Sequence, residues 1–429
     1  MNNTLNAKTV METIQWFVFL LANTVAMPIV IGAIYDMSLI EVSGLMQRSF
    51  FVIGAASLLQ ALFGHRLPII EGPAGIWISI FSVMAVTGLH NGTSLNGTLR
   101  SLETTMILTG FILFLFGAFK IAQKILPIFT PLVTGTFFLL LTVQLSGTFL
   151  SGMLGLQGDT STIQLTEATL AFITFFIILG LSVFARGWLS NFAVFIGIII
   201  GWVSYLIVVD QPSYNQNVNL FSIPEIFAFG MPAIDLSVVP MAFITAIIII
   251  SNVVASIIAV NQTLGVESEE MNAQMNKGTA FSGINHGLAG IFSAIANVPL
   301  AVSSGFIALT GQKRKMPFIY AAILLIFIAF FPPIISLISS IPSPIANAAL
   351  MASFIQLVGL AIRNLASVQL DSRKATIVGI AYLIGMGTMF LPTEVFVDLP
   401  SILQNVISNG LLVGTILVIL MEQLWKEEK

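Results

Sequence analysis

The amino-acid sequence predicts an all-α polytopic membrane protein with fourteen transmembrane segments. Three observations carry this prediction: the composition, the length of the apolar segments and the distribution of the basic residues. Of the 429 residues, 57% are hydrophobic and 8% are charged, and the mean hydropathy is +1.00. Soluble domains carry about 25% charged residues. A chain with so few charges cannot cover a water-facing surface, so we expect a lipid bilayer around it.

The apolar residues are grouped into segments long enough to cross a bilayer. A transmembrane helix needs about 20 mostly apolar residues. On this criterion the segments lie near 13–35, 43–63, 69–87, 102–121, 131–150, 167–185, 189–209, 237–260, 279–296, 298–312, 316–336, 343–362, 374–391 and 405–424.

The basic residues test this count independently, because cytoplasmic loops of membrane proteins are enriched in Lys and Arg. With fourteen segments and the N-terminus inside, all of the sixteen basic residues except Arg48 and Arg100 fall on the inner side. If the ninth and tenth segments were merged into one, every loop after the basic cluster at 313–315 would fall on the opposite side of the membrane. The sequence therefore predicts a multi-pass protein of the cell membrane, plasma or inner, with both termini in the cytoplasm.

Two of the predicted segments contain residues that break helices. The third segment reads Pro-Ile-Ile-Glu-Gly-Pro-Ala-Gly over 68–75, and the tenth reads Asn-Val-Pro-Leu-Ala-Val-Ser-Ser-Gly over 297–305. Pro removes a backbone donor and Gly loosens the backbone. Irregular chain at membrane depth is tolerated only inside protein or beside a cavity.

The positions of the two breaks indicate an internal repeat. Each break lies in the third segment of a seven-segment half, and an odd number of crossings makes the second half run opposite to the first. We therefore expect an inverted repeat of residues 1–209 and 237–429, joined by an extracellular connector at 210–236. Interrupted segments at corresponding places in two halves point to the binding site of a transporter.

Polar residues near the breaks are the candidates for function. Glu71 is the only acidic residue that the pattern places well inside a segment, as a proton carrier, a substrate acceptor or a structural acceptor for broken backbone. Ser251 and Asn252 belong to a polar set in the eighth segment that either lines a site or joins helices. The ring of Trp77 either stacks on a flat heterocycle or packs in the core.

Several classes of function are excluded by what the sequence lacks. It contains no Cys, no H-E-x-x-H, no G-x-S-x-G and no Walker A pattern, so an intramembrane enzyme, a metal site and direct ATP drive are unsupported. No cofactor is expected. No run of basic residues indicates a nucleic-acid partner. A secondary transporter is the class that the paired breaks favour over a passive channel.

The sequence resembles the nucleobase/ascorbate transporter family (nucleobase:cation symporter-2), and is most similar to its purine/uracil–xanthine permease branch. The resemblance covers the whole chain, including its fourteen-segment layout. It rests on Gln15-Trp16-Phe17, Asn23-Thr24-Val25 with Pro28, Gly64-His65-Arg66, Glu71-Gly72-Pro73, Asn297 and Ser408-Asn409-Gly410-Leu411-Leu412-Val413-Gly414.

The resemblance implies a seven-plus-seven inverted repeat divided into a core and a gate domain. It also implies short antiparallel strands in segments three and ten, which hold a base together with segment eight. Members of the family couple uptake to protons and work as homodimers. The expected function is a nucleobase permease, with a purine favoured as substrate, in proton symport.

The sequence departs from the family at the base-reading acids. Where the family has a carboxylate in segment eight, this sequence has Ser251. Where the family has an acid or Gln followed by Asn in segment ten, this sequence has Val302 and Ser303. The Lys or Arg that often follows in the family is replaced by Gly311. This departure keeps an anion carrier of the same fold as the alternative, because inward-pointing half-helix ends suit anions. The candidate substrate-binding residues are Glu71, Gly75, Trp77, Ser251, Asn252, Ala301, Val302 and Ser303, with Glu71 as the candidate for proton coupling.

Overall fold

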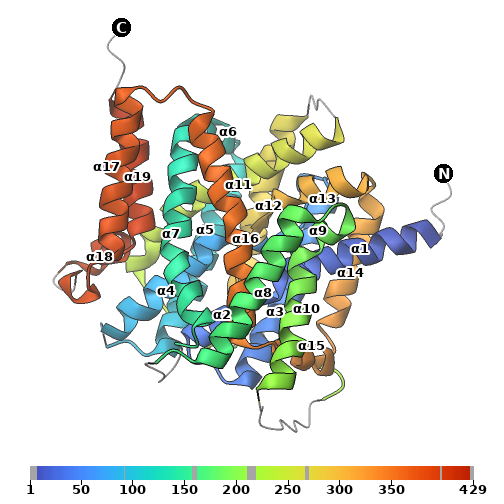
Figure 1. The fold of residues 1–429 in the computed structure, drawn as a ribbon. Coiled ribbons are helices and arrows are strands. Elements are labelled where there is room, and N and C mark those ends of the chain that lie inside the picture. The colour runs from blue at the N-terminus through green and yellow to red at the C-terminus, as the bar shows by residue number, and fades with distance from the viewer. Residues whose placement is uncertain are drawn as a thin grey trace.

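The computed structural model describes residues 7–90, 92–156, 162–209, 219–265, 270–396 and 399–425. The chain is mostly helical and its long helices run side by side (Figure 1). In chain order the elements are α1 (Ala7–Thr24), α2 (Ala26–Ile34), α3 (Leu39–Leu62), β1 (Glu71–Pro73), α4 (Gly75–His90), α5 (Leu95–Ala118), α6 (Ala122–Ile125), η1 (Leu126–Ile128), α7 (Pro131–Met153), α8 (Leu165–Phe184), α9 (Trp188–Asn191), α10 (Ala193–Val208), η2 (Leu236–Val238), α11 (Val239–Leu264), α12 (Met271–Ile291), β2 (Asn297–Pro299), α13 (Val302–Thr310), α14 (Lys315–Ile328), α15 (Pro332–Ser339), α16 (Ser343–Ala366), α17 (Ser372–Met389), η3 (Thr393–Phe396), α18 (Ser401–Ile407) and α19 (Gly410–Leu424).

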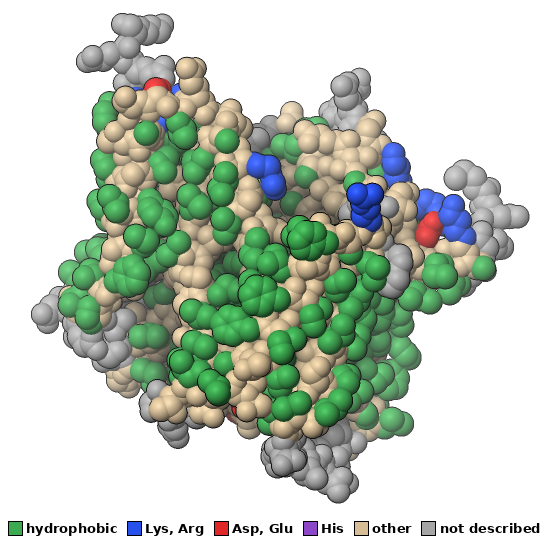
Figure 2. All heavy atoms as spheres, in the orientation of Figure 1, with side chains coloured by type: hydrophobic (Ala, Val, Ile, Leu, Met, Phe, Trp, Pro, Cys, Tyr) green, Lys and Arg blue, Asp and Glu red, His purple; other side chains and the backbone are tan. Residues whose placement is uncertain are grey.

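The third and tenth predicted segments each fall on a short strand followed by a helix, and every other predicted segment falls on one helix or a pair of helices. The prediction of a mostly helical protein is confirmed. Within the described part of the chain, seven helices are long and apolar enough to cross a membrane. The pair α14 and α15, bent by 93° at its break, would make an eighth span. The count of fourteen stays a prediction. Hydrophobic side chains cover much of the visible face, as expected for a lipid-facing surface (Figure 2).

The two predicted breaks are the places where the backbone leaves the helical conformation. Strands β1 and β2 pair antiparallel, with Glu71 opposite Pro299, Gly72 opposite Val298 and Pro73 opposite Asn297. Both strands are buried. Each strand is followed by a helix, α4 or α13, so each break is a strand that leads into a half-helix. The expectation of short antiparallel strands in segments three and ten is therefore confirmed.

The helices pack in two groups, and each group takes elements from both halves of the chain. In the core group, α5 packs along α12, α3 along α14, and α1 and α11 lie against α14 and α5. In the gate group, α7 packs along α16, α8 along α10, and α17 along α19. The two groups meet where α2 lies against α16 and α4 against α7.

The described part of the connector, 219–235, contains no helix and crosses one end of the core group. The Ser222 amide donates to the Phe330 carbonyl (3.1 Å), and the Phe227 amide donates to the Ile291 carbonyl (2.8 Å). The Arg100 guanidinium donates to the Met231 carbonyl (2.7 Å). These bonds join the connector to α5 and to the ends of α12 and α14.

Glycines bring α5 and α12 into backbone contact in the core group. A Cβ on Gly283 would lie 2.5 Å from the Gly110 carbonyl oxygen, which is closer than real Cβ contacts allow. A Cβ on Gly287, one turn further along the same helix, would meet nothing within 4 Å. Small residues at such interfaces let membrane helices pack closely.

We predict that Gly283→Ala destabilises the protein and that Gly287→Ala does not. Overpacking of a tight interface costs about 1–3 kcal/mol, whereas Ala in an open helical position is up to about 1 kcal/mol better than Gly. The melting temperatures of the two purified variants in one detergent measure the difference. Equal melting temperatures would mean that α5 and α12 are not this close.

Candidate functional site

Two serine hydroxyls fix the paired strands from neighbouring helices. The Ser256 hydroxyl of α11 donates to the Pro299 carbonyl of β2 (2.7 Å). The Ser303 hydroxyl of α13 accepts from the Ile70 amide, just before β1 (3.0 Å). Buried backbone groups need such partners wherever helical bonds are missing. These two bonds join α11 to β2 and α13 to the chain just before β1.

Glu71 lies in β1 and is completely buried. Its amide donates to the Ser57 hydroxyl of α3 (3.1 Å). Neither carboxyl oxygen has a hydrogen-bond partner among the described residues. The Asn285 amide lies beside the carboxyl, and Nε2 of His65 lies 4.0 Å from Oε1. The predicted acid thus faces the inside of the core group.

Trp77 is also completely buried, on the side of α4 that faces α12. Its indole Nε1–H donates to Nε2 of His286 (3.1 Å), and Nδ1 of His286 lies 2.7 Å from the Ser282 carbonyl. These two bonds require a neutral imidazole with its proton on Nδ1. In this conformation the indole packs against protein, and its role in stacking on a substrate stays a prediction.

The remaining predicted residues lie where side chains are accessible. Ser251 and Asn252 on α11 are half-buried, and the Ser251 hydroxyl donates to the Ile248 carbonyl of its own helix (2.8 Å). Ala301 and Val302, at the start of α13, are exposed. Val302 exposes 41% of its surface. The start of α13 is thus an open end of a half-helix beside α11.

Gly75 begins the other half-helix, α4, and faces the gate group. A Cβ on Gly75 would lie 3.1 Å from the Phe354 ring of α16 and 3.3 Å from the Leu141 side chain of α7. A larger residue would push against both helices. The structure therefore divides the predicted residues into two sets: Gly75, Ser251, Asn252, Ala301 and Val302 at accessible or gate-facing positions, and Glu71, Trp77 and Ser303 on the buried side of the strands.

A second buried carboxyl corrects the expectation that Glu71 is the only acid well inside a segment. Glu103 of α5 is completely buried and accepts a hydrogen bond from the Ser293 hydroxyl. The Arg48 guanidinium donates to the Ser293 carbonyl (3.2 Å) and lies 5.2 Å from the centroid of the Phe229 ring. Glu103 sits only one residue into the predicted segment, where an acid usually remains at the interface.

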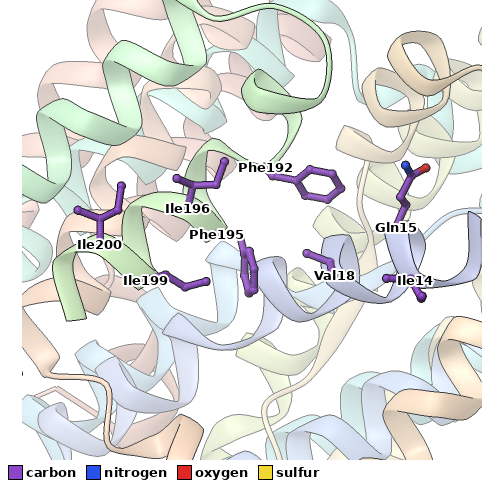
Figure 3. A pocket seen from close by; sticks show the side chains of 8 residues that line it. All are labelled: Ile14, Gln15, Val18, Phe192, Phe195, Ile196, Ile199 and Ile200. Carbon is purple, nitrogen blue, oxygen red and sulfur yellow. The ribbon is translucent and has the colours of Figure 1, made fainter. Parts of the chain in front are cut away.

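An apolar groove of about 400 Å³ lies elsewhere, between α1 and α10 (Figure 3). Its only polar lining residue is Gln15. None of the predicted site residues lines it. A groove without paired donors and acceptors cannot orient a heterocycle, so we do not assign it to the substrate. Its lining is Ile14, Gln15, Val18, Phe192, Phe195, Ile196, Ile199 and Ile200.

Comparison with known families settles the class of the protein. The sequence profile of the permease family (Xan_ur_permease) matches residues 7–394. The chain belongs to this permease family. The resemblance to the nucleobase:cation symporter-2 family is therefore confirmed. A permease is a membrane-embedded transporter and not an enzyme.

Two relatives extend over almost the whole permease. A protein of Bacillus subtilis (strain 168) named "Putative purine permease YwdJ" is 30% identical over 432 residues, which cover 98% of this chain and 97% of the relative. The xanthine permease of the same organism is 25% identical over 414 residues, which cover 95% of this chain and 91% of the relative.

A solved structure supports the fold of the permease. The transmembrane domain of a cyanobacterium bicarbonate transporter, BicA, has a TM-score of 0.66 and 14% sequence identity, covering 97% of this chain and 99% of that domain. At this identity the likeness concerns the fold alone. It extends over nearly the entire permease.

We predict that Ser256→Ala lowers the melting temperature of the permease more than Ser251→Ala does. The first change removes the hydroxyl bound to β2 and leaves a buried carbonyl short of a donor, at a cost of about 1–3 kcal/mol. The second removes a hydroxyl that bonds only within its own helix. Thermal unfolding of both variants without substrate measures the difference, and an equal loss would show that Ser256 does not brace the strand.

Proposed function

We propose that the permease is a secondary active transporter that carries a nucleobase, preferably a purine, together with a proton. The observation that carries this proposal is the pair of strand-to-half-helix breaks, placed beside a buried acid and beside accessible helix ends. Broken spans at corresponding places are typical of transporter sites. The names of the two relatives supply the substrate class: one is named for purines and the other for xanthine.

The proposed architecture is a fourteen-span inverted repeat, and the packing of the helices supports it. If each element is exchanged for its counterpart seven segments away, the pair α5–α12 becomes α14–α3, and both pairs are in contact. In the same way α1–α14 becomes α11–α5, and α8–α10 becomes α17–α19. A repeat with boundaries at 1–209 and 237–429 accounts for these matched contacts.

The proposed orientation places both termini in the cytoplasm of a cell-membrane protein. Lys and Arg side chains on the visible face lie in its upper half (Figure 2). One-sided basic residues are the main topological signal in membrane proteins. A homodimer stays a prediction from the family resemblance.

The proposed substrate site lies between the starts of α4 and α13 and the accessible face of α11. Backbone groups at Gly75, Ala301 and Val302 can bond the edge of a planar base, since the first turn of a helix has amides without helical partners. Ser251 and Asn252 add a hydroxyl and an amide, each with donor and acceptor capacity. Small residues at the lost acid positions leave room for the larger purine ring.

Glu71 is the proposed carrier of the coupling proton. A carboxyl buried in the membrane is functional by default, because holding its charge there is costly. Its place in β1 makes it part of the unit that would hold the base. Protonation can therefore change the shape or stability of the strand pair.

An anion substrate is the less favoured alternative. The bicarbonate transporter named above shares the fold, but at 14% identity that likeness says nothing about substrate. The relative at 30% identity is named for a purine.

We predict that purine bases raise the melting temperature of the purified permease and that sulfate and bicarbonate do not. A ligand at 100 times its dissociation constant adds about 2.7 kcal/mol to the stability of a folded state that alone binds it. The panel consists of xanthine, hypoxanthine, guanine, adenine, urate and uracil, together with the two anions. Stabilisation by an anion alone would contradict the proposal.

A further inference from the structure

Among the residues that the structure describes, His65 is the titratable side chain that forms a close pair with the proposed proton carrier. It lies in the link between α3 and β1 and is completely buried. Its Nε2 is 4.0 Å from Oε1 of Glu71. No sequence pattern pairs His65 with Glu71, because the distance between them depends on the non-helical path of the chain from 63 to 71.

The surroundings of His65 fix the nitrogen that carries the ring proton. Its Nδ1 accepts a hydrogen bond from the Leu67 amide (3.0 Å). A ring nitrogen that accepts a hydrogen bond carries no proton, so the proton of the neutral ring is on Nε2. This Nε2–H lies on the side of Glu71 and has no acceptor among the described residues. A doubly protonated ring would lose the bond from Leu67.

The position of the ring is held from two sides. The His65 amide donates to the Gln60 side-chain oxygen (3.3 Å). The Gln60 side-chain nitrogen in turn donates to the Gly278 carbonyl (2.9 Å) and to the Ser282 hydroxyl (3.0 Å) of α12. The backbone that carries the ring is therefore anchored to α3 and, through Gln60, to α12, while Glu71 belongs to the strand.

We propose that His65 is the proton-release partner of Glu71: its Nε2–H donates to the carboxylate once Glu71 has lost its proton. The 4.0 Å separation is too long for a hydrogen bond and suits a protonated, uncharged carboxyl. A charged carboxylate needs donors when it is buried. Closing the gap to about 2.9 Å would form a charge-assisted bond. The proton of Glu71 passes to water, and His65 keeps its own proton.

This step would move β1 relative to the anchored ring by about 1 Å, the difference between the two separations. The strand is tightly packed against the start of the other half-helix: a Cβ on Gly72 would lie 2.5 Å from a methyl carbon of Leu300. A shift of β1 is therefore passed to the residues just before α13. Release of the proton and the geometry of the proposed substrate site are linked through this contact.

Other polar groups face the pair from the elements packed around it. Asn285 of α12 lies beside the Glu71 carboxyl, and its side-chain amide has no partner among the described residues, so it can serve as a second donor. The charge of Lys315, at the start of α14, acts on His65. The neighbouring His286 is neutral, and both of its ring nitrogens are engaged with Trp77 and Ser282.

Infrared difference spectroscopy of the purified permease across pH tests the pair without any substrate. Protonated Glu71 should contribute a carboxylic-acid C=O band that is absent from Glu71→Gln and kept in Glu103→Gln. Removal of one hydrogen bond to a carboxylate shifts its titration midpoint by about one to two pH units. The shift is upward, because the proton-free form loses its donor.

Two amide substitutions at His65 distinguish the loss of the hydrogen bond to Glu71 from a general disturbance of the fold. His65→Gln places an amide N–H near the position of Nε2, and His65→Asn is too short to reach Glu71. We expect the midpoint of His65→Gln to stay near that of the wild type, and the midpoint of His65→Asn to rise by about one pH unit. An unchanged midpoint in His65→Asn, or an equal rise in both variants, would overturn the proposal.

The role of the pair in transport rests on the proton-coupled mechanism proposed above, but the spectroscopic result does not. If no base stabilises the permease and the titration midpoint of Glu71 still rises in His65→Asn, the substrate proposal is wrong and the proposed pair is supported. If bases bind and the midpoint is unchanged in His65→Asn, the proposed pair is wrong and the substrate proposal is unaffected.

Discussion

Backbone hydrogen bonding at membrane depth is the constraint on which the rest of this structure depends. Where Pro and Gly end the helical pattern, amides and carbonyls lose their partners and water is not there to replace them. The antiparallel pairing of β1 with β2 supplies part of what is missing. Ser57, Ser256 and Ser303 supply more, each by one bond to the chain at or next to a strand. Because the strand of each half pairs with the strand of the other half, neither half can form the strand pair alone.

The sequence predicted the features that depend on local composition. Helix-breaking residues in 68–75 and 297–305 located both breaks, and apolar length located the helices. It could not reveal contacts that arise from distant segments. Trp77 and His286 are 209 positions apart in sequence. His65 meets Glu71 only because the chain between them is not helical. The burial of Glu103 was not predicted because it depends on neighbouring helices and the connector. The length of an apolar segment does not show which other segments cover its end.

The completely buried carboxyls of Glu71 and Glu103 have different surroundings. Glu103 accepts a hydrogen bond from the Ser293 hydroxyl, and the Arg48 guanidinium donates to the carbonyl of the same serine. Glu71 has a neutral ring and a neutral amide nearby, and its carboxyl oxygens form no hydrogen bond among the described residues. A carboxyl that can gain donors by a small movement can change its protonation state during a cycle. The bond between Glu103 and Ser293 joins α5 to the residues just after α12.

Uptake of a radiolabelled purine into proteoliposomes under an imposed pH gradient tests the central claim that Glu71 couples proton movement to transport. For the wild type and for Glu103→Gln, our account predicts accumulation when the lumen is alkaline relative to the outside. For Glu71→Gln it predicts exchange of internal for external purine without accumulation, because the substituted side chain cannot release a proton. Gradient-driven accumulation by Glu71→Gln at the wild-type level would contradict the account.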